Sequence, residues 1–297
     1  MKKVKYPPKH KDGGHQPPEY QRDPYTPDIR YYVGEQYYGA YATSNPPEYV
    51  PHSLEHSCFR PAPEYDVPPR RCEDAYEGCD PQLRVRINQA MMTQDQRDRF
   101  LNAYQQLIDS NFLGPLVSIH SNATHQMHGN PRFLPWHRVY LLRLEEMLQS
   151  IDPTITIPYW RSSEDQSFPG WLSGFLPAVN GHTVTRNPGA PPILPDVTAV
   201  NNVINNNNTF ASFAPALEGI HNTGHVWVGG SMSTIANAPA DPVFWMHHAE
   251  IDRIWNEWQG LNPGENPNLM GAAAVMDPWS ETETDTRSIT QMGYTYA

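Results

Sequence analysis

Residues 241–260 read DPVFWMHHAEIDRIWNEWQG, and this stretch has the start, the end and the apolar content of one buried helix. Asp241 is a suitable N-cap, the proline after it occupies the first helical position, and Gly260 is suited to the C-terminus. The tryptophans along the stretch are expected to pack in a core. The same helix contains two adjacent histidines, His247 and His248, which an ordinary core helix does not need.

Three further segments have helical signals, so the sequence predicts a mainly α fold. The segment TQDQRDRFLNAYQQLIDSNFLG (93–114) opens with a capping box of Thr93 and Gln96. LPWHRVYLLRLEEMLQSI (134–151) has a proline in its first turn and apolar residues along one side. A shorter helix is expected in EGIHNTGHVWVGG (218–230), ending at its two glycines. With residues 241–260, these segments predict a four-helix bundle core.

The remaining segments are predicted to be long loops and an extension. LRVRINQA (83–90) alternates apolar and polar residues like a short strand. Residues 161–212, including NNVINNNN, are rich in Pro, Asn and Gly and are interpreted as loop. Residues 1–81 are rich in Pro, Tyr and charge without a sustained period, so we expect an N-terminal extension there and one compact domain over 82–297.

Composition excludes some partners and leaves localisation open. The net charge of -11 argues against nucleic acid and anionic membrane surfaces as partners. The absence of a long apolar run predicts a chain without a membrane span or an evident export signal. The protein is therefore expected to be soluble, either cytoplasmic or secreted with a signal absent from this chain. The pairing of Cys58, Cys72 and Cys79 stays open because their number is odd.

The histidines on the predicted helices fall into two groups. His221 and His225 are four residues apart, which places both rings on one helical face with Cβ atoms about 5–6 Å apart, where they can share a metal ion. His247 or His248 could supply a third ligand. The earlier group consists of His120, at the end of LVSIH, and of His128 and His137, which bracket HGNPRFLPWH. His125 is a further candidate.

The ligand types favour two copper ions. Imidazole without thiolate or carboxylate suits copper or zinc, and a single three-histidine zinc site would leave one group unused. A di-iron bundle needs two Glu-x-x-His pairs, whereas the sequence has one, Glu218 to His221. A zinc protease helix needs Glu after its first histidine, where this chain has Asn222. Two copper ions with three histidines each is the most economical interpretation.

Three stretches, HGNPRFLPWHRVYLLRLEEML, HNTGHVWVGG and DPVFWMHHAEIDRIWNEWQ, resemble the two copper-binding regions of the tyrosinase family of type 3 copper proteins. This family includes catechol oxidases and is related to haemocyanins. The resemblance runs from about residue 84 to the terminal GYTYA. It implies a helical core that houses a dicopper centre, with O2 as co-substrate. Its implied ligands are His120, His128 and His137 for the first ion, and His221, His225 and His248 for the second.

The resemblance also implies which histidine of the adjacent pair binds copper. In the family's paired histidines the second is the ligand, so His247 would be a neighbour of the ligands. Helical geometry agrees, because a step of about 100° per residue keeps adjacent side chains from facing the same ion. Asp252, one turn after His248, is expected to hold a neighbouring imidazole or Arg253, and Phe244 is expected to pack against a ligand ring.

The implied activity is that of a tyrosinase acting on a small phenol, with ortho-hydroxylation of monophenols and oxidation of o-diphenols to o-quinones. Asn222 and Glu218 would jointly orient the water that deprotonates the phenol. Val226 and Ile235 would line the substrate entrance. A catechol or o-aminophenol oxidase without hydroxylation, a haemocyanin-like oxygen carrier, and a binding module built on the extension stay open as alternatives. A copper-delivery partner is also left open.

Overall fold

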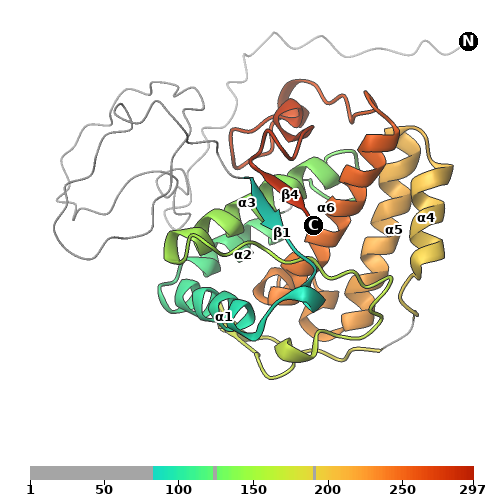
Figure 1. The fold of residues 1–297 in the computed structure, drawn as a ribbon. Coiled ribbons are helices and arrows are strands. Elements are labelled where there is room, and N and C mark those ends of the chain that lie inside the picture. The colour runs from blue at the N-terminus through green and yellow to red at the C-terminus, as the bar shows by residue number, and fades with distance from the viewer. Residues whose placement is uncertain (1–82, 123–125, 190–191) are drawn as a thin grey trace, which may run out of the picture. The chain divides into compact units, whose positions relative to one another are not determined.

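The computed structural model describes residues 83–122, 126–189 and 192–297. These residues form a helical fold with very little strand (Figure 1), as the sequence predicts. The helices are α1 Gln94–Asp109, α2 Leu113–Ser121, α3 Phe133–Ile151, α4 Val197–Asn206, α5 Phe210–Val228 and α6 Pro242–Leu261. Among them none is both long enough and apolar enough to cross a membrane. The predicted extension, its three cysteines and His125 lie outside the described residues.

Two short strand pairs tie the helices together. β1 Arg84–Arg86 runs parallel to β4 Tyr294–Tyr296, so the first and last described segments lie side by side (Figure 1). β2 Ala178–Val179 pairs antiparallel with β3 His182–Thr183. The strand expected in 83–90 is therefore confirmed over three residues, and it continues into a 3-10 turn at Gln89–Met91.

Three of the predicted helix ends are confirmed, but Gly260 does not end its helix, because α6 runs on to Leu261 with Asn262 as its C-cap. Thr93 and Gln96 form the capping box of α1, with hydrogen bonds of 2.8 and 3.2 Å. The Asp241 side chain accepts from the backbone N–H of Val243 at 3.0 Å. α5 stops at Gly229, whose φ of 68° suits a residue without Cβ.

The prediction that residues 161–212 are loop was wrong at two places. α4 covers the start of the Asn-rich run, and α5 begins at Phe210 rather than near residue 218. Asp196 caps α4 by accepting from the N–H of Ala199 at 2.8 Å, and Val200 and Ile204 bury one face of it. Tertiary packing of an amphipathic face therefore outweighs the weak helix propensity of asparagine.

The helix predicted over 93–114 is two helices. α1 ends at Asp109, Asn111 takes a positive φ of 58°, and α2 begins at Leu113. A left-handed residue cannot continue a helix, so the chain turns there. This break matters for the site, because α2 ends with the turn that carries His120.

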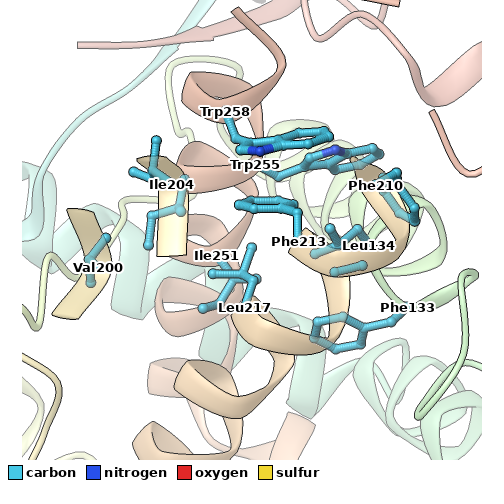
Figure 2. Packing of buried hydrophobic residues seen from close by; sticks show 12 residues of the cluster. Phe133, Leu134, Val200, Ile204, Phe210, Phe213, Leu217, Ile251, Trp255 and Trp258 are labelled. Atoms are coloured by element: carbon cyan, nitrogen blue, oxygen red, sulfur yellow. The ribbon is translucent and has the colours of Figure 1, made fainter. Parts of the chain in front are cut away.

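A cluster of buried hydrophobic residues holds α5 against α6 (Figure 2). It draws side chains from the start of α3, from α4, and from both long helices. The rings of Phe213 and Trp258 stack with centroids 4.2 Å apart, and Trp255 and Trp258 are completely buried, as the sequence predicts for these tryptophans. Because His221, His225 and His248 lie on the same two helices, this core sets the distance between them.

Candidate metal centre

Three histidines from α2, α3 and the loop before α3 meet at one point. The Nε2 atoms of His120 and His137 are 3.3 Å apart, and the ring of His128 lies 5.0 Å from both other rings. One ring nitrogen from each lies within 4.8 Å of the other two. Nδ1 of His120 donates to the carbonyl of Ile235 and Nδ1 of His137 donates to that of Phe133, both at 2.8 Å. Because a carbonyl only accepts, the proton of each neutral ring is on Nδ1, and Nε2 keeps a lone pair that can bind a metal ion.

A second trio forms between α5 and α6. The three Nε2 atoms of His221, His225 and His248 lie 2.9, 3.1 and 3.2 Å from one another. Nδ1 of His225 donates to the carbonyl of Met232 at 2.8 Å, and Nδ1 of His221 donates to Oδ1 of Asn222 at 3.1 Å. Ligand nitrogens about 2.0 Å from one ion in a tetrahedral arrangement lie roughly 3.3 Å apart, so this spacing fits a single ion.

His247 also brings a ring nitrogen within 4.8 Å of those of His221 and His225, so distance alone allows two groupings. Its Nε2, however, donates to the backbone carbonyl of His221 at 3.0 Å. Its ring lies against α5, since a Cβ added at Gly224 would be 2.3 Å from Cε1. The three mutually closest Nε2 atoms are therefore those of His221, His225 and His248.

The charge state of these rings fits metal binding. Burial lowers the pKa of all seven histidines, and neighbouring imidazoles lower it further in five of them. The pKa of His120 falls to about 3, and those of His128 and His247 to about 4. The rings are neutral at physiological pH, so lone pairs face one another across each trio. Such an arrangement is unfavourable without a cation, and neutral imidazole is the ligand that copper accepts.

The rings of the two trios are neighbours. The rings of His137 in the first trio and His248 in the second stack at 4.4 Å with an interplanar angle of 19°. Phe244 lies 4.1 Å from His248 and 5.0 Å from His120, while Phe133 lies 4.7 Å from His221 and 4.9 Å from His137. These two phenylalanine rings are completely or almost completely buried and contact both trios, which keeps water from the spaces between the rings.

One face of α5 carries the other predicted catalytic residues. Glu218, His221, Asn222 and His225 stand at i, i+3, i+4 and i+7, so they lie together along the helix. The Glu218 carboxylate accepts from the N–H of Gly129, the residue after His128, at 2.8 Å. Burial raises the pKa of Glu218, which is half-buried. The carboxylate thus sits between α5 and the loop of the first trio.

The two predicted entrance residues are exposed. The side chains of Val226 and Ile235 are 44% and 58% exposed. Val226 follows His225 on α5, and the backbone carbonyl of Ile235 holds His120. Both positions are therefore adjacent in the chain or in space to a predicted ligand.

The partners predicted for Asp252 from sequence were wrong. Its carboxylate holds neither an imidazole nor Arg253; it accepts from Arg138 at 2.5 Å and from the hydroxyls of Tyr294 and Tyr296 at 2.8 and 2.6 Å. Arg253 instead pairs with two glutamates of its own helix. Burial opposes ionisation of Asp252, but Arg138 and Arg86 outweigh it and lower its pKa. These partners lie more than 40 residues away in sequence, so helical spacing could not reveal them.

Two positions near the site were missed from sequence. Gly224 lies near the C-terminal end of α5, and the glycine lets the His247 ring approach the helix backbone. A glycine within a helix is unfavourable by propensity, and this was the available signal. Ser231 is buried, and its hydroxyl contacts Nε2 of His182 at 2.7 Å and accepts from the N–H of Thr185 at 2.9 Å. It thereby fixes the turn whose next residue, Met232, holds His225.

Comparison with known proteins agrees with this geometry. The common central domain of tyrosinase matches residues 110–188 and 178–261. The tyrosinases of Streptomyces antibioticus and Streptomyces glaucescens are each 32% identical over 258 residues, covering 67% of this chain and 94% of the relative. Grixazone synthase of Streptomyces griseus is 28% identical, covering 72% of this chain and 99% of the relative.

Solved structures share the fold at lower identity. A functional unit of octopus haemocyanin superposes with a TM-score of 0.58 at 22% identity, covering 71% of this chain and 67% of that one. The tyrosinase of Burkholderia thailandensis superposes with a TM-score of 0.55 at 18% identity, covering 72% and 74%. With two histidine trios suited to copper, the chain belongs to the tyrosinase family of type 3 copper enzymes, and its cofactor is a pair of copper ions.

Proposed function

We propose that this protein is a phenol oxidase that hydroxylates monophenols at the ortho carbon and oxidises o-diphenols to o-quinones. The observation that carries the proposal is the pair of adjacent neutral imidazole trios, with a carboxylate and an amide on one face of α5. The proposed ligands are His120, His128 and His137 for one ion, and His221, His225 and His248 for the other. The copper pair would supply O2 binding and the redox chemistry.

Backbone carbonyl groups orient three of the proposed ligands. Backbone carbonyls of Ile235, Phe133 and Met232 hold Nδ1–H of three rings, which leaves Nε2 free to bind and fixes each ring's orientation. His247 acts as a positioning residue, because it donates to the carbonyl of His221 and its ring lies parallel to that of His221 at 5.4 Å.

Glu218 and Asn222 are proposed to accept the phenol's proton through a water. A free phenol has a pKa of about 10, so it needs a base at neutral pH. A carboxylate whose pKa is raised by burial is a better base than an ordinary glutamate, provided that it stays ionised. Asn222 uses its carbonyl oxygen for His221, which leaves its amide N–H groups to hold the water.

The entrance favours an uncharged phenolic ring. Val226 and Ile235 present apolar surface to solvent, and neither offers a charge to pair with a carboxylate or an amine. A small phenol is therefore the proposed substrate class, with O2 as co-substrate.

Oxygen uptake by Glu218→Gln tests the role of the base. We expect the variant to lose monophenol turnover by about 10²-fold or more, the contribution typical of a general base. Its turnover of catechol should stay close to that of the unaltered protein, because an o-diphenol is oxidised to the quinone without prior hydroxylation. Glu257→Gln is the matched control, since Glu257 is 47% exposed and pairs with Arg253 toward the C-terminal end of α6. Equal loss on both substrates would contradict a specific role as base.

A second candidate is a catechol or o-aminophenol oxidase without hydroxylation. Relatives named tyrosinase and grixazone synthase both match this chain over nearly their full length, so the family likeness supports either activity. Brisk catechol oxidation without any hydroxylation of tyramine by the unaltered protein would favour this candidate. Reversible O2 binding without turnover of either phenol would instead indicate an oxygen carrier. Activity after loading with free copper salt would show that no delivery partner is required.

A further inference from the structure

The side chains that react with o-quinones are distributed very unevenly along the chain. All five lysines lie between Lys2 and Lys11, and all three cysteines lie between Cys58 and Cys79. Residues 83–297 contain neither, although lysine is among the commonest residues of globular proteins. Their cationic side chains are eleven arginines, which stay protonated and are poor nucleophiles. The catalytic part of the chain therefore offers no thiol and no lysine amine to a quinone.

The phenols show the same division. Eleven of the sixteen tyrosines precede residue 83, and the sequence Pro-Glu-Tyr occurs there three times, ending at Tyr20, Tyr49 and Tyr65. The five later tyrosines are buried or half-buried, and each hydroxyl donates a hydrogen bond to a carbonyl or to Asp252. These are Tyr104, Tyr140, Tyr159, Tyr294 and Tyr296. None of them can enter the copper site without unfolding.

We propose that the N-terminal extension, residues 1–82, is a substrate of the copper site on the same chain. Its tyrosines are oxidised to o-quinones, which then couple to its cysteines and lysines. The proposal rests on the monophenol hydroxylation proposed above. It explains why the lysines and cysteines are confined to the extension and why most of the tyrosines lie there too.

The chain length allows the reaction within one molecule. Arg86, near the start of the described residues, contacts Asp252 at 3.5 Å, and Asp252 is one helical turn after His248 on α6. Tyr65 precedes Arg84 by nineteen residues. That tether spans up to about 60 Å when extended, against a radius of gyration of about 17 Å for a domain of this size. Tethering also raises the effective concentration of such a tyrosine to the millimolar range.

The site entrance accepts a tyrosine carried on a polypeptide. Val226 and Ile235 are exposed apolar side chains next to His225 and His120, so they can pack against prolines that flank a phenol. The extension has such neighbours, with proline two residues before the tyrosine in each Pro-Glu-Tyr sequence.

Each step balances with O2 as the only oxidant. One tyrosine and one O2 give one o-quinone and one water: the ring gains one oxygen atom and loses two hydrogen atoms. A cysteine thiol then adds to the quinone ring, so that an S–H bond breaks and a C–S bond forms. The thiol and ring protons move to the two quinone oxygens, and the quinone is reduced to a catechol thioether. A lysine amine adds in the same way through nitrogen.

Peptide mass spectrometry of the copper-loaded full chain tests the proposal. Incubation in air without added phenol should add one oxygen and remove two hydrogens at extension tyrosines. It should also abolish the free thiols of Cys58, Cys72 and Cys79 and produce tyrosine–cysteine links that reducing agents do not break. The same protein without copper should stay unmodified, and the five tyrosines of the catalytic part should be unchanged in both samples. The initial rate per molecule should not change on serial dilution.

A free substrate in parallel separates this inference from the proposed function. If N-acetyltyrosine amide is hydroxylated while the extension stays unmodified, the inference is wrong and the proposed function stands. If neither is hydroxylated, both fail. A rate that falls on dilution would show transfer between molecules and contradict oxidation within one chain. As a matched control, replacement of the eleven extension tyrosines by Phe should abolish the phenol-free oxygen uptake and leave turnover of the free substrate unchanged.

Discussion

Gly224→Ala should weaken copper binding although alanine is the better helix former. Gly224 lies in α5, where alanine would by propensity alone stabilise the helix by about 1 kcal/mol. The added Cβ, however, would lie 2.3 Å from Cε1, 2.8 Å from Nε2 and 3.0 Å from Nδ1 of His247. Carbon atoms prefer about 3.5–4.0 Å, so the ring must move by roughly 1 Å or more.

The expected magnitude follows from what the His247 ring contacts. Overpacking typically costs about 1–3 kcal/mol, and losing the hydrogen bond from His247 to the carbonyl of His221 would leave a buried N–H unpaired, at about 1–3 kcal/mol more. After the gain in propensity, the variant should be less stable by about 1–5 kcal/mol. Because His247 supports the second trio, copper affinity there should fall by about 10- to 100-fold.

Thermal unfolding and competition with a copper chelator measure the two effects. Gly219→Ala is the control, since Gly219 lies on the same helix with nothing within 4 Å of the added Cβ and should be slightly stabilised. Adding His247→Ala to Gly224→Ala should remove the clash and recover stability without restoring copper affinity. If Gly224→Ala matches the Gly219→Ala control in both assays, the close approach of His247 to α5 has been misread.

Three further outcomes are expected. Phe213→Ala removes the ring stacked on Trp258 at 4.2 Å and should lower the free energy of unfolding by about 3–5 kcal/mol, measured by chemical denaturation. Ser231→Ala should weaken copper at the second trio by about tenfold in a chelator titration, because Ser231 fixes the turn that holds His225. In copper-free protein, rings such as His120, whose pKa is lowered to about 3, take up protons on unfolding below pH 6.5. The unfolding free energy should therefore fall on acidification from pH 6.5 toward 3, by up to about 1.4 kcal/mol per pH unit for each such ring, and a flat pH profile would contradict this.

The sequence alone was sufficient for features that depend on neighbouring residues. The capping box at Thr93, the N-cap at Asp241 and the glycine stop at Gly229 each rely on contacts within a few residues, and all three were predictable. The spacing of His221 and His225 likewise placed two rings on one face, since helix periodicity alone determines it.

Features that depend on packing between distant segments could not be predicted. The Asn-rich run forms α4 because Val200 and Ile204 bury against other helices, which no local propensity shows. Asp252 was assigned to the wrong partners because Arg138 and Tyr294 reach it from α3 and β4. Spacing along one helix says nothing about which groups approach from another.

The site shows the same division between local and tertiary information. Sequence identified the histidines and left His247 and His248 as alternatives until a family resemblance ranked them. Only the folded chain brings the His248 Nε2 within 3.2 Å of two others and turns the His247 Nε2 toward a backbone carbonyl. A helix presents its residues at fixed angles, but which of two adjacent rings faces a shared point depends on where the opposing helix lies, and that position is determined by the packing of the whole core.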